Sequence, residues 1–480
     1  MILMLFISAF TMPLIKNNRT IKRLSIGTMI ISTGLGLSTL LTVIKSGSFF
    51  YRVGHWDAPW GIELYISPLE AAVSVLFTSV AALILWYSFY TIEKEISSDK
   101  VSFYYLLIHV LIGSLLGIVF TNDIFNAFVF IEISTLASCG IVVIKDKKEN
   151  IKAALKYLIL SVLGSGLFLM GIAFLYSITG NLNISFIQME IMKVKDAYPD
   201  IILIAVSLFT VGLGVKSAMF PLHTWLPDAH SNAPSASSAI LSSLVLKGFV
   251  LLLVKLLFRA LGLELLKELP IFDLILALGS LGMILGSIFA ILQKEIKRVI
   301  AYSSVAQMGY IFFGIGLASE LGTAVAVYHI FGHAVTKALL FLTVGAMIEM
   351  TGKKKVEELK GIGKEMPLTL GLFTVGALSM VGIPILPGFV SKWNLALASI
   401  SSGKPILIAV ILISSILNAL YYFPVVINGF FGEENLKGLQ FRSKQKPVKE
   451  MLPVICLSIG MFFVGLVSNS LINLFGQGLR

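Results

Sequence analysis

Residues 201–230 read IILIAVSLFTVGLGVKSAMFPLHTWLPDAH, and this stretch decides the fold. Its first half is almost entirely apolar, and about 20 apolar residues in a helix cross the ~30 Å hydrocarbon core of a bilayer. Lys216 lies near the middle of the stretch, and two prolines, Pro221 and Pro227, follow this lysine. The stretch therefore predicts a transmembrane helix that is interrupted beside a buried charge.

Similar apolar runs recur along the whole chain. Its 480 residues are 57% hydrophobic and only 13% charged, with a mean hydropathy of +0.92. A water-soluble core could not hide that much apolar surface, so we predict an all-α polytopic membrane protein with about fourteen transmembrane helices. The first run lacks the basic region and cleavage site of a secretory signal, so it is expected to be a helix. The expected spans are 1–15, 24–44, 67–92, 103–120, 122–144, 153–178, 201–225, 235–260, 270–291, 299–318, 321–350, 367–400, 405–430 and 450–475.

The net charge of +11 is explained by membrane topology rather than by nucleic-acid binding. Lys and Arg are retained on the cytoplasmic side of a membrane protein. The loops that follow odd-numbered spans hold 23 of these residues, and the other loops together with the C-terminus hold 9. This ratio predicts a multi-pass protein of the cell membrane with both termini on the outer side.

Five lysines remain inside the expected spans. A charged side chain at mid-bilayer costs at least ~2.5–3.5 kcal/mol, so it is normally paired, faces a cavity and serves a function. Lys156 lies about one turn into its span, so it either snorkels to the interface or belongs to a functional site. Near the far end of helix 8, Lys255 and Arg259 are expected to snorkel. The five lysines are Lys156, Lys216, Lys247, Lys337 and Lys392.

One carboxylate lies equally deep. Glu132 stands in the middle of FNAFVFIEISTLASCG, residues 125–140. A carboxylate and an ammonium at that depth stabilise each other's charged forms, so we predict that Glu132 pairs with Lys216. The pair is interpreted as part of a translocation site, and the alternative is an ion pair that only ties two helices together.

Two histidines precede Lys337 in AVYHIFGHAVTKALLFL, residues 326–342. His329, His333 and Lys337 are spaced at i, i+4 and i+8, which places them on one face of a helix. Histidine titrates near neutral pH and both accepts and passes a proton. We interpret the three side chains as a proton relay, with hydrogen-bonded packing residues as the alternative.

Helices 7 and 12 carry the marks of broken helices. Prolines follow Lys216, and the segment VGIPILPGFVSK, residues 381–392, places two prolines and two glycines before Lys392. Proline removes a backbone donor, which is tolerated at membrane depth only where protein or water satisfies the freed carbonyls. Broken helices at matching positions of two halves mark the transport site of inverted-repeat carriers. We therefore predict two inverted five-helix repeats, with helices 4–8 in residues 103–260 and helices 9–13 in 270–430. Helices 1–3 would occupy 1–102, and helix 14 would occupy 450–475.

Three segments carry a family resemblance. GVKSAMFPLHTWLPDAHSNAPSASSAILSSLVLKGF (214–249), QKEIKRVIAYSSVAQMGY (293–310) and FGHAVTKALLFLTVGAM (331–347) resemble antiporter-like subunits. These subunits are shared by complex I (NADH-quinone oxidoreductase), Mrp-type Na+/H+ antiporters and membrane-bound hydrogenases. YRVGHWDAPWGIELYISPLEA (51–71) is more similar to the Mrp D-type and hydrogenase branch.

The resemblance implies a horizontal polar axis at the membrane midplane and a place beside related subunits. It assigns proton translocation to Glu132, Lys216, Lys247, His329, His333, Lys337 and Lys392. We therefore expect a proton-translocating subunit of an Mrp-type antiporter or of a hydrogenase-, sulfur-reductase- or complex I-related respiratory complex.

The alternative is a stand-alone secondary carrier for a small organic substrate. No cysteine cluster, haem motif or nucleotide loop occurs in the sequence, so no cofactor, metal or redox chemistry is expected in this chain. The expected partners are related antiporter-like and small membrane subunits, with iron–sulfur subunits performing any redox step. No nucleic-acid partner is expected.

Overall fold

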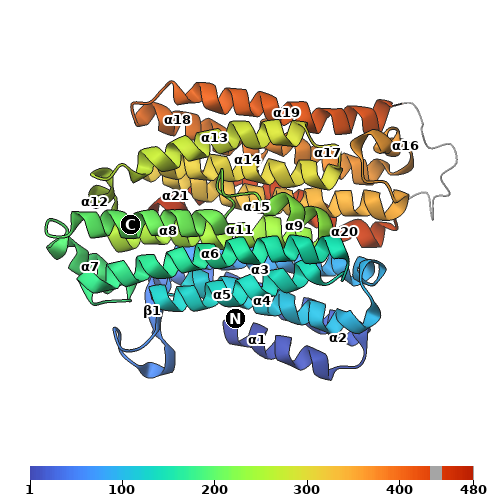
Figure 1. The fold of residues 1–480 in the computed structure, drawn as a ribbon. Coiled ribbons are helices and arrows are strands. Elements are labelled where there is room, and N and C mark those ends of the chain that lie inside the picture. The colour runs from blue at the N-terminus through green and yellow to red at the C-terminus, as the bar shows by residue number, and fades with distance from the viewer. Residues whose placement is uncertain (433–445, 479–480) are drawn as a thin grey trace.

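The computed structural model describes residues 1–432 and 446–478, and it is a bundle of long, roughly aligned helices (Figure 1). Within the described residues, twelve helices are long and apolar enough to cross a membrane. The longer elements are α2 (Asn18–Ser46), α3 (Pro68–Glu95), α4 (Val101–Phe120), α5 (Ile124–Val143), α6 (Lys148–Thr179), α8 (Pro199–Lys216), α13 (Ile271–Ile291), α14 (Ile296–Gly316), α15 (Glu320–Thr351), α19 (Leu407–Phe431), α20 (Val448–Leu466), and the continuous helix of α10 (Ser235–Ile240), η4 (Leu241–Val245), α11 (Leu246–Lys255) and η5 (Leu256–Leu261).

Shorter elements complete the bundle. The expected count of fourteen spans is not reproduced, because two of them correspond to shorter apolar helices, Ile2–Leu14 and Pro367–Val381. The span expected at 367–400 is divided into two helices, α17 (Pro367–Val381) and α18 (Pro387–Ser401). The last expected span, 450–475, ends at Leu466, and a separate helix, α21 (Ser468–Gly478), follows it. The shorter helices are α1 (Ile2–Thr11), α7 (Ile184–Val194), α9 (Leu226–Asn232), α12 (Leu263–Lys267), α16 (Ile362–Glu365), α17 (Pro367–Val381), α18 (Pro387–Ser401) and α21 (Ser468–Gly478).

The two ends of the bundle differ in character. At one end, β1 (Phe49–Arg52) and β2 (Glu63–Ile66) pair antiparallel, with Phe49 opposite Ile66. Met1 lines a cavity with residues of both strands, and Gly478 approaches Leu69 beside them, so both described chain ends lie here. We call this the hairpin end. The opposite end, where Lys94, Lys145 and Arg298 make their ion pairs, is called the basic end.

The centre of the bundle consists of α15 and the helix from α10 to η5. The most apolar 18-residue segment of each helix is 100% buried, whereas the corresponding segment of α2 is 28% buried. These two central helices carry Lys247, His329, His333 and Lys337. These four side chains therefore lie on the most deeply buried elements, whereas Glu132 and Lys216 lie on α5 and α8, which are about half buried.

Glycines bring α13 and α14 into backbone contact. A Cβ atom at Gly309 would lie 2.5 Å from the Met283 nitrogen and 2.8 Å from the Gly279 oxygen. Real Cβ atoms do not approach backbone that closely, and small residues at helix interfaces are the usual means of such contact in membranes. The close approach holds α14, and with it Ser303 and Ser304, in place beside α15.

We predict that Gly309→Ala lowers the free energy of unfolding by about 1–3 kcal/mol, because the methyl group overpacks a rigid backbone contact. Gly371→Ala is the matched control, since a Cβ atom there meets nothing within 4 Å. Thermal unfolding of the detergent-purified protein compares the two variants. Equal midpoints for both would contradict the packing argument.

Candidate functional site

Glu132 and Lys216 meet at the interface of α5 and α8. Lys216 Nζ donates a hydrogen bond to Thr135 Oγ1 at 2.7 Å and lies 4.0 Å from Glu132 Oε1. The Lys216 side chain is 1% exposed, whereas that of Glu132 is 34% exposed. The predicted pairing is confirmed, and Thr135, one turn after Glu132, adds a second oxygen to the lysine's surroundings.

The break in helix 7 falls directly after this lysine. Helix α8 ends at Lys216, and Ala218 adopts a left-handed backbone conformation with φ 55°. Trp225 Nε1 then donates to the Val215 carbonyl at 2.9 Å, which satisfies one acceptor that the ended helix leaves free. The break therefore places Lys216 at a helix terminus, with its backbone held by a buried indole.

Serines of α14 lie between Lys247 and Lys337. The Lys247 ammonium donates to the Ser242 carbonyl, and the Ser242 and Ser304 hydroxyls are 2.9 Å apart. Lys337 donates to Ser303 Oγ and to the Ile300 carbonyl, which also accepts from Ser304. Ser242 thus contacts Lys247 through its backbone carbonyl and Ser304 through its hydroxyl, so the hydrogen bonds in the described chain are interrupted at this residue; both lysines are fully buried.

The helix around Lys247 is locally widened. Residues Leu241–Val245 form a π-helical turn, and the lysine side chain bonds to a carbonyl five residues before it. Single π turns inside α-helices occur mostly at functional sites, because they release backbone groups from the regular ladder. Nothing in the residue pattern signals this turn, since its composition is that of an ordinary apolar helix.

The two histidines stack along α15 toward α18. The ring centroids of His329 and His333 are 5.9 Å apart, and His329 Nδ1 is 2.8 Å from Ser391 Oγ. His329 Nε2 and both ring nitrogens of His333 are buried without a hydrogen-bond partner among the described residues. Buried polar atoms of this kind are usually satisfied by ordered water, so the space around these rings is suited to hydration.

Lys392 lies at the break between α17 and α18. Its ammonium donates to the Met380 and Val381 carbonyls, each at 2.8 Å, and lies 5.0 Å from the Tyr310 ring centroid. These carbonyls belong to the C-terminal turn of α17, where a cation is favoured by the helix dipole. The broken helix therefore supplies the ligands of its own lysine.

Of the seven predicted translocation residues, which we call the row, six are buried inside the bundle and Glu132 is partly exposed at its surface. The row is not joined throughout. Between Lys216 and Lys247 no direct hydrogen bond occurs in the described part of the chain, and Lys216 faces the Phe249 ring at 5.5 Å. Lys156 lies outside the row, because it pairs with Asp228 at 2.8 Å near the basic end.

Several polar residues in and beside the row were not singled out from the sequence. Ser391 contacts His329, and Tyr310 stacks on the same histidine with centroids 5.6 Å apart. His230 is fully buried, stacks on Phe341 and has no hydrogen-bond partner for either nitrogen in the described chain. The position of His230 inside the LPDAH segment could have indicated a functional role from the sequence. Ser391 and Tyr310 could be recognised only from the structure, because their contacts with His329 join different helices.

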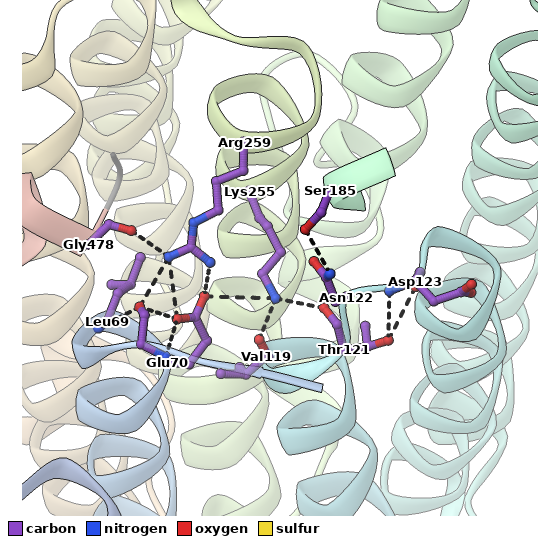
Figure 2. Close-up of polar contacts among 11 residues, drawn as sticks. Leu69, Glu70, Val119, Thr121, Asn122, Asp123, Ser185, Lys255, Arg259 and Gly478 are labelled. Carbon is purple, nitrogen blue, oxygen red and sulfur yellow. Dashed lines mark hydrogen bonds and ion pairs between the residues drawn. The ribbon is translucent and has the colours of Figure 1, made fainter. Parts of the chain in front are cut away.

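A second charged cluster lies at the hairpin end, and it corrects a prediction (Figure 2). Lys255 and Arg259 were expected to snorkel, but both are turned inward toward a buried carboxylate. Arg259 donates to Glu70 Oε1 at 2.5 Å and to Ser67 Oγ at 3.1 Å, and it also bonds to the Gly478 carbonyl. Snorkelling is wrong here because Glu70 lies in the first turn of α3, within reach of both cations.

The cluster joins four elements. Lys255 Nζ lies 3.8 Å from Glu70 Oε1 and donates to the Val119 and Thr121 carbonyls at the end of α4 (Figure 2). Since Arg259 also holds the end of α21, the cluster fastens α3, α4, the central helix and the C-terminal helix together. Lys255 lies two turns after Lys247 on the central helix. Because the cluster ties this end of the helix to its neighbours, it acts as a structural anchor for the helix that carries Lys247.

The fold and the buried row of ionisable side chains define a multi-pass, antiporter-like membrane subunit. A family model described as "NADH:quinone oxidoreductase/Mrp antiporter, TM" matches residues 121–418. The chain belongs to this family, as the sequence resemblance implied.

Curated relatives agree with this assignment. The N-type subunit of NADH-quinone oxidoreductase from Desulforudis audaxviator is 35% identical over 90% of this chain and 87% of that protein. The D-type subunit of the Na(+)/H(+) antiporter from Alkalihalophilus pseudofirmus is 31% identical over 90% of this chain and 85% of that protein. Both relatives are components of multi-subunit membrane proteins.

Two solved structures share the fold over nearly the whole chain. A chain of the membrane-bound sulfane sulfur reductase, an archaeal respiratory complex, has a TM-score of 0.90 and 28% identity, covering 100% of this chain and 96% of that one. A chain of the Mrp complex from Dietzia sp. has a TM-score of 0.90 and 21% identity, covering 99% and 95%. Together with the curated relatives, these structures support an antiporter-like subunit and not a stand-alone carrier.

We predict that Glu70→Gln destabilises the protein by about 3–5 kcal/mol, because it leaves two buried cations without their carboxylate. Asp273→Asn is the control: it removes the same charge from an exposed pair, with Lys404 at 2.8 Å, and should cost at most about 1 kcal/mol. Thermal unfolding of the purified protein measures both variants. A smaller loss for Glu70→Gln than for Asp273→Asn would refute the anchoring role.

Proposed function

We propose that this chain translocates protons across the cell membrane as one subunit of a multi-subunit complex. The observation that supports this proposal is the burial of four lysines and two histidines within the bundle. They are Lys216, Lys247, His329, His333, Lys337 and Lys392. Charges at membrane depth are costly and are retained where they serve ion or proton movement. The row is Glu132, Lys216, Lys247, His329, His333, Lys337 and Lys392.

The Glu132–Lys216 pair acts as a switch in this proposal. When the carboxylate is near, it stabilises the ammonium form of Lys216; when it moves away, the lysine releases its proton. The 4.0 Å separation and the intervening Thr135 hydroxyl suit a contact that is made and broken rather than a fixed salt bridge. The released proton passes toward Lys247.

The second half of the row receives that proton. The hydroxyls of Ser242, Ser304 and Ser303 lie between Lys247 and Lys337, and water joins the first of them to Lys247 in this proposal. Both α15 histidines have ring nitrogens without a protein partner in the described chain, which exchange protons with water. Lys392 ends the row, where the backbone carbonyls of the broken helix stabilise its charged form. Water molecules complete the segment between Lys216 and Lys247, where protein contacts alone do not connect the row.

Two inverted five-helix repeats, helices 4–8 and 9–13, remain part of the proposal. The breaks after Lys216 and before Lys392 occupy matching positions in these repeats. The excess of Lys and Arg places the basic end in the cytoplasm and the hairpin end, with both described chain ends, outside.

A neighbouring membrane subunit covers the outer face of α5 in this proposal. Glu132 is 34% exposed on the surface of the single chain, beside the exposed apolar side chains of Val129 and Leu136. A partly exposed carboxylate at membrane depth would be unfavourable against lipid, so a polar group of a partner subunit is expected there. In a respiratory complex, iron–sulfur subunits would supply the redox chemistry.

We predict that Glu132→Ala, Lys216→Ala and Lys392→Ala each abolish ion translocation while the complex still assembles. Each change removes a titratable group from the row, and loss of a positioned proton-transfer group typically costs 10²–10⁴-fold in rate. Proton movement is measured with a pH-sensitive dye in inverted membrane vesicles that contain the whole complex.

Lys193→Ala is the control for removing a lysine, because this residue is 65% exposed and its ion pair among the described residues is with Glu190 on its own helix. It should leave translocation unchanged. Full activity with any two of the three row substitutions would defeat the site assignment. Identification of the subunits that copurify in mild detergent separates an Mrp-type antiporter from a redox-driven complex.

A further inference from the structure

A polar cavity opens at the basic end. Its volume is ≈ 440 Å³, and charged and amide side chains of α3, α6, α14, α15 and the segment before α10 form its wall. A cavity of this size holds many water molecules, since one needs only about 10–15 Å³. None of the seven row residues lines it, so its role is not explained by the row itself.

Glu95 lies at the wall of this cavity, at the last residue of α3. Its carboxylate accepts hydrogen bonds from the Ser235 backbone N–H at 3.0 Å and from Lys145 at 2.6 Å. The Ser235 N–H belongs to the first turn of the central helix, whose dipole favours a negative charge there. The side chain is 19% exposed, so it is in contact with the cavity. Its hydrogen bonds to Ser235 and Lys145 stabilise its negative charge.

Behind Glu95 lie buried polar atoms that nothing in the described protein satisfies. The Tyr104 and Ser237 hydroxyls and both nitrogens of His230 are buried without a hydrogen-bond partner among the described residues. The Tyr104 hydroxyl lies close to that of Ser237, outside ideal hydrogen-bond geometry, and interacts electrostatically with Glu95, while His230 interacts electrostatically with Lys337 and Lys247. Unsatisfied polar atoms in a native interior require an explanation, and ordered water or proton transfer is the usual one.

We propose that Glu95 is the entry residue through which protons reach the buried row from the cavity at the basic end. The Glu95 carboxylate takes a proton from cavity water, and Tyr104, Ser237 and bridging water pass it to His230. His230 delivers the proton to Lys247 or Lys337. The carboxylate is regenerated in its ionised form, so no oxidant, reductant or other co-reactant is needed.

The route has a built-in link to the Glu132–Lys216 pair. Lys145, which pairs with Glu95, lies two residues after the end of α5, and α5 also carries Glu132. A shift of α5 that changes the Glu132–Lys216 distance also changes the Lys145–Glu95 distance. Lys297 of α14 and Lys145 both favour the ionised carboxylate of Glu95, so withdrawal of Lys145 removes one of two opposite charges and increases the affinity of Glu95 for a proton.

This inference rests on the proposed function, and the experiment separates the two. Glu95→Gln is compared with Glu149→Gln in inverted vesicles containing the whole complex, because Glu149 lines the same cavity but is exposed at its rim. We expect Glu95→Gln to slow proton movement about tenfold or more, Glu149→Gln to stay within about twofold, and Glu95→Asp to recover most of the rate.

A second measurement does not depend on how Glu95→Gln folds. In a protein whose native Cys139 and Cys456 are replaced by serine, Ser235→Cys is treated with a membrane-impermeant methanethiosulfonate. Ser235 lines the cavity, whereas Ser243, the control position, is fully buried two turns farther along the helix. We expect Ser235→Cys to react from the basic end and to lose proton movement on labelling, and Ser243→Cys to remain unreactive.

The possible results separate the entry route from the proposed function. If Lys216→Ala is inactive while Glu95→Gln has wild-type rates, the entry route is wrong and the proposed function stands. Reaction rates at Ser235→Cys equal to those at Ser243→Cys would also overturn the route. Full activity of the row substitutions would remove the proposed function itself, and the entry proposal with it.

Discussion

The structure depends on one constraint: an ammonium group in a membrane interior must be surrounded by oxygen atoms that the protein itself provides. Lys337 and Lys392 obtain theirs from backbone carbonyls of neighbouring helices, and Lys216 obtains a threonine hydroxyl and a distant carboxylate. Each carbonyl inside a regular helix already accepts one bond there, and only its second lone pair remains, which Ile300 of α14 uses for Lys337. The break in helix 12 and the π turn before Lys247 supply the further backbone carbonyls that bind Lys392 and Lys247.

The same constraint explains the arrangement of the bundle. The helices that bear Lys247, His329, His333 and Lys337 are at the centre, whereas Glu132 and Lys216 lie on the less buried helices α5 and α8. The glycine contacts between α13 and α14 bring serine hydroxyls close to the central lysines. Burial of charge and close backbone packing are therefore coupled: without the packing, the lysines would lack their ligands.

The two ends of the bundle use charge differently. At the hairpin end, Glu70 is enclosed by Arg259 and Lys255 and by the ends of two helices, which is an arrangement for holding elements together (Figure 2). At the basic end, Glu95 has similar partners but borders a cavity of ≈ 440 Å³. A carboxylate beside water can exchange protons, whereas one sealed between two cations cannot do so readily. Contact with solvent, rather than the identity of the cationic partners, therefore distinguishes the anchoring role of Glu70 from the proton-entry role proposed for Glu95.

Residue spacing by itself determined the membrane class, the approximate spans, the positions of the two breaks and the pairing of Glu132 with Lys216. Those features follow from local rules, because apolar length, proline position and the cost of an isolated charge are all readable along the chain. The assembled helices decided the rest: the inward turn of Lys255 and Arg259, the π turn, the serine contacts and the cavity beside Glu95. Each of these depends on residues that are far apart in the sequence, or on the shape of a backbone turn, and neither leaves a mark in local composition.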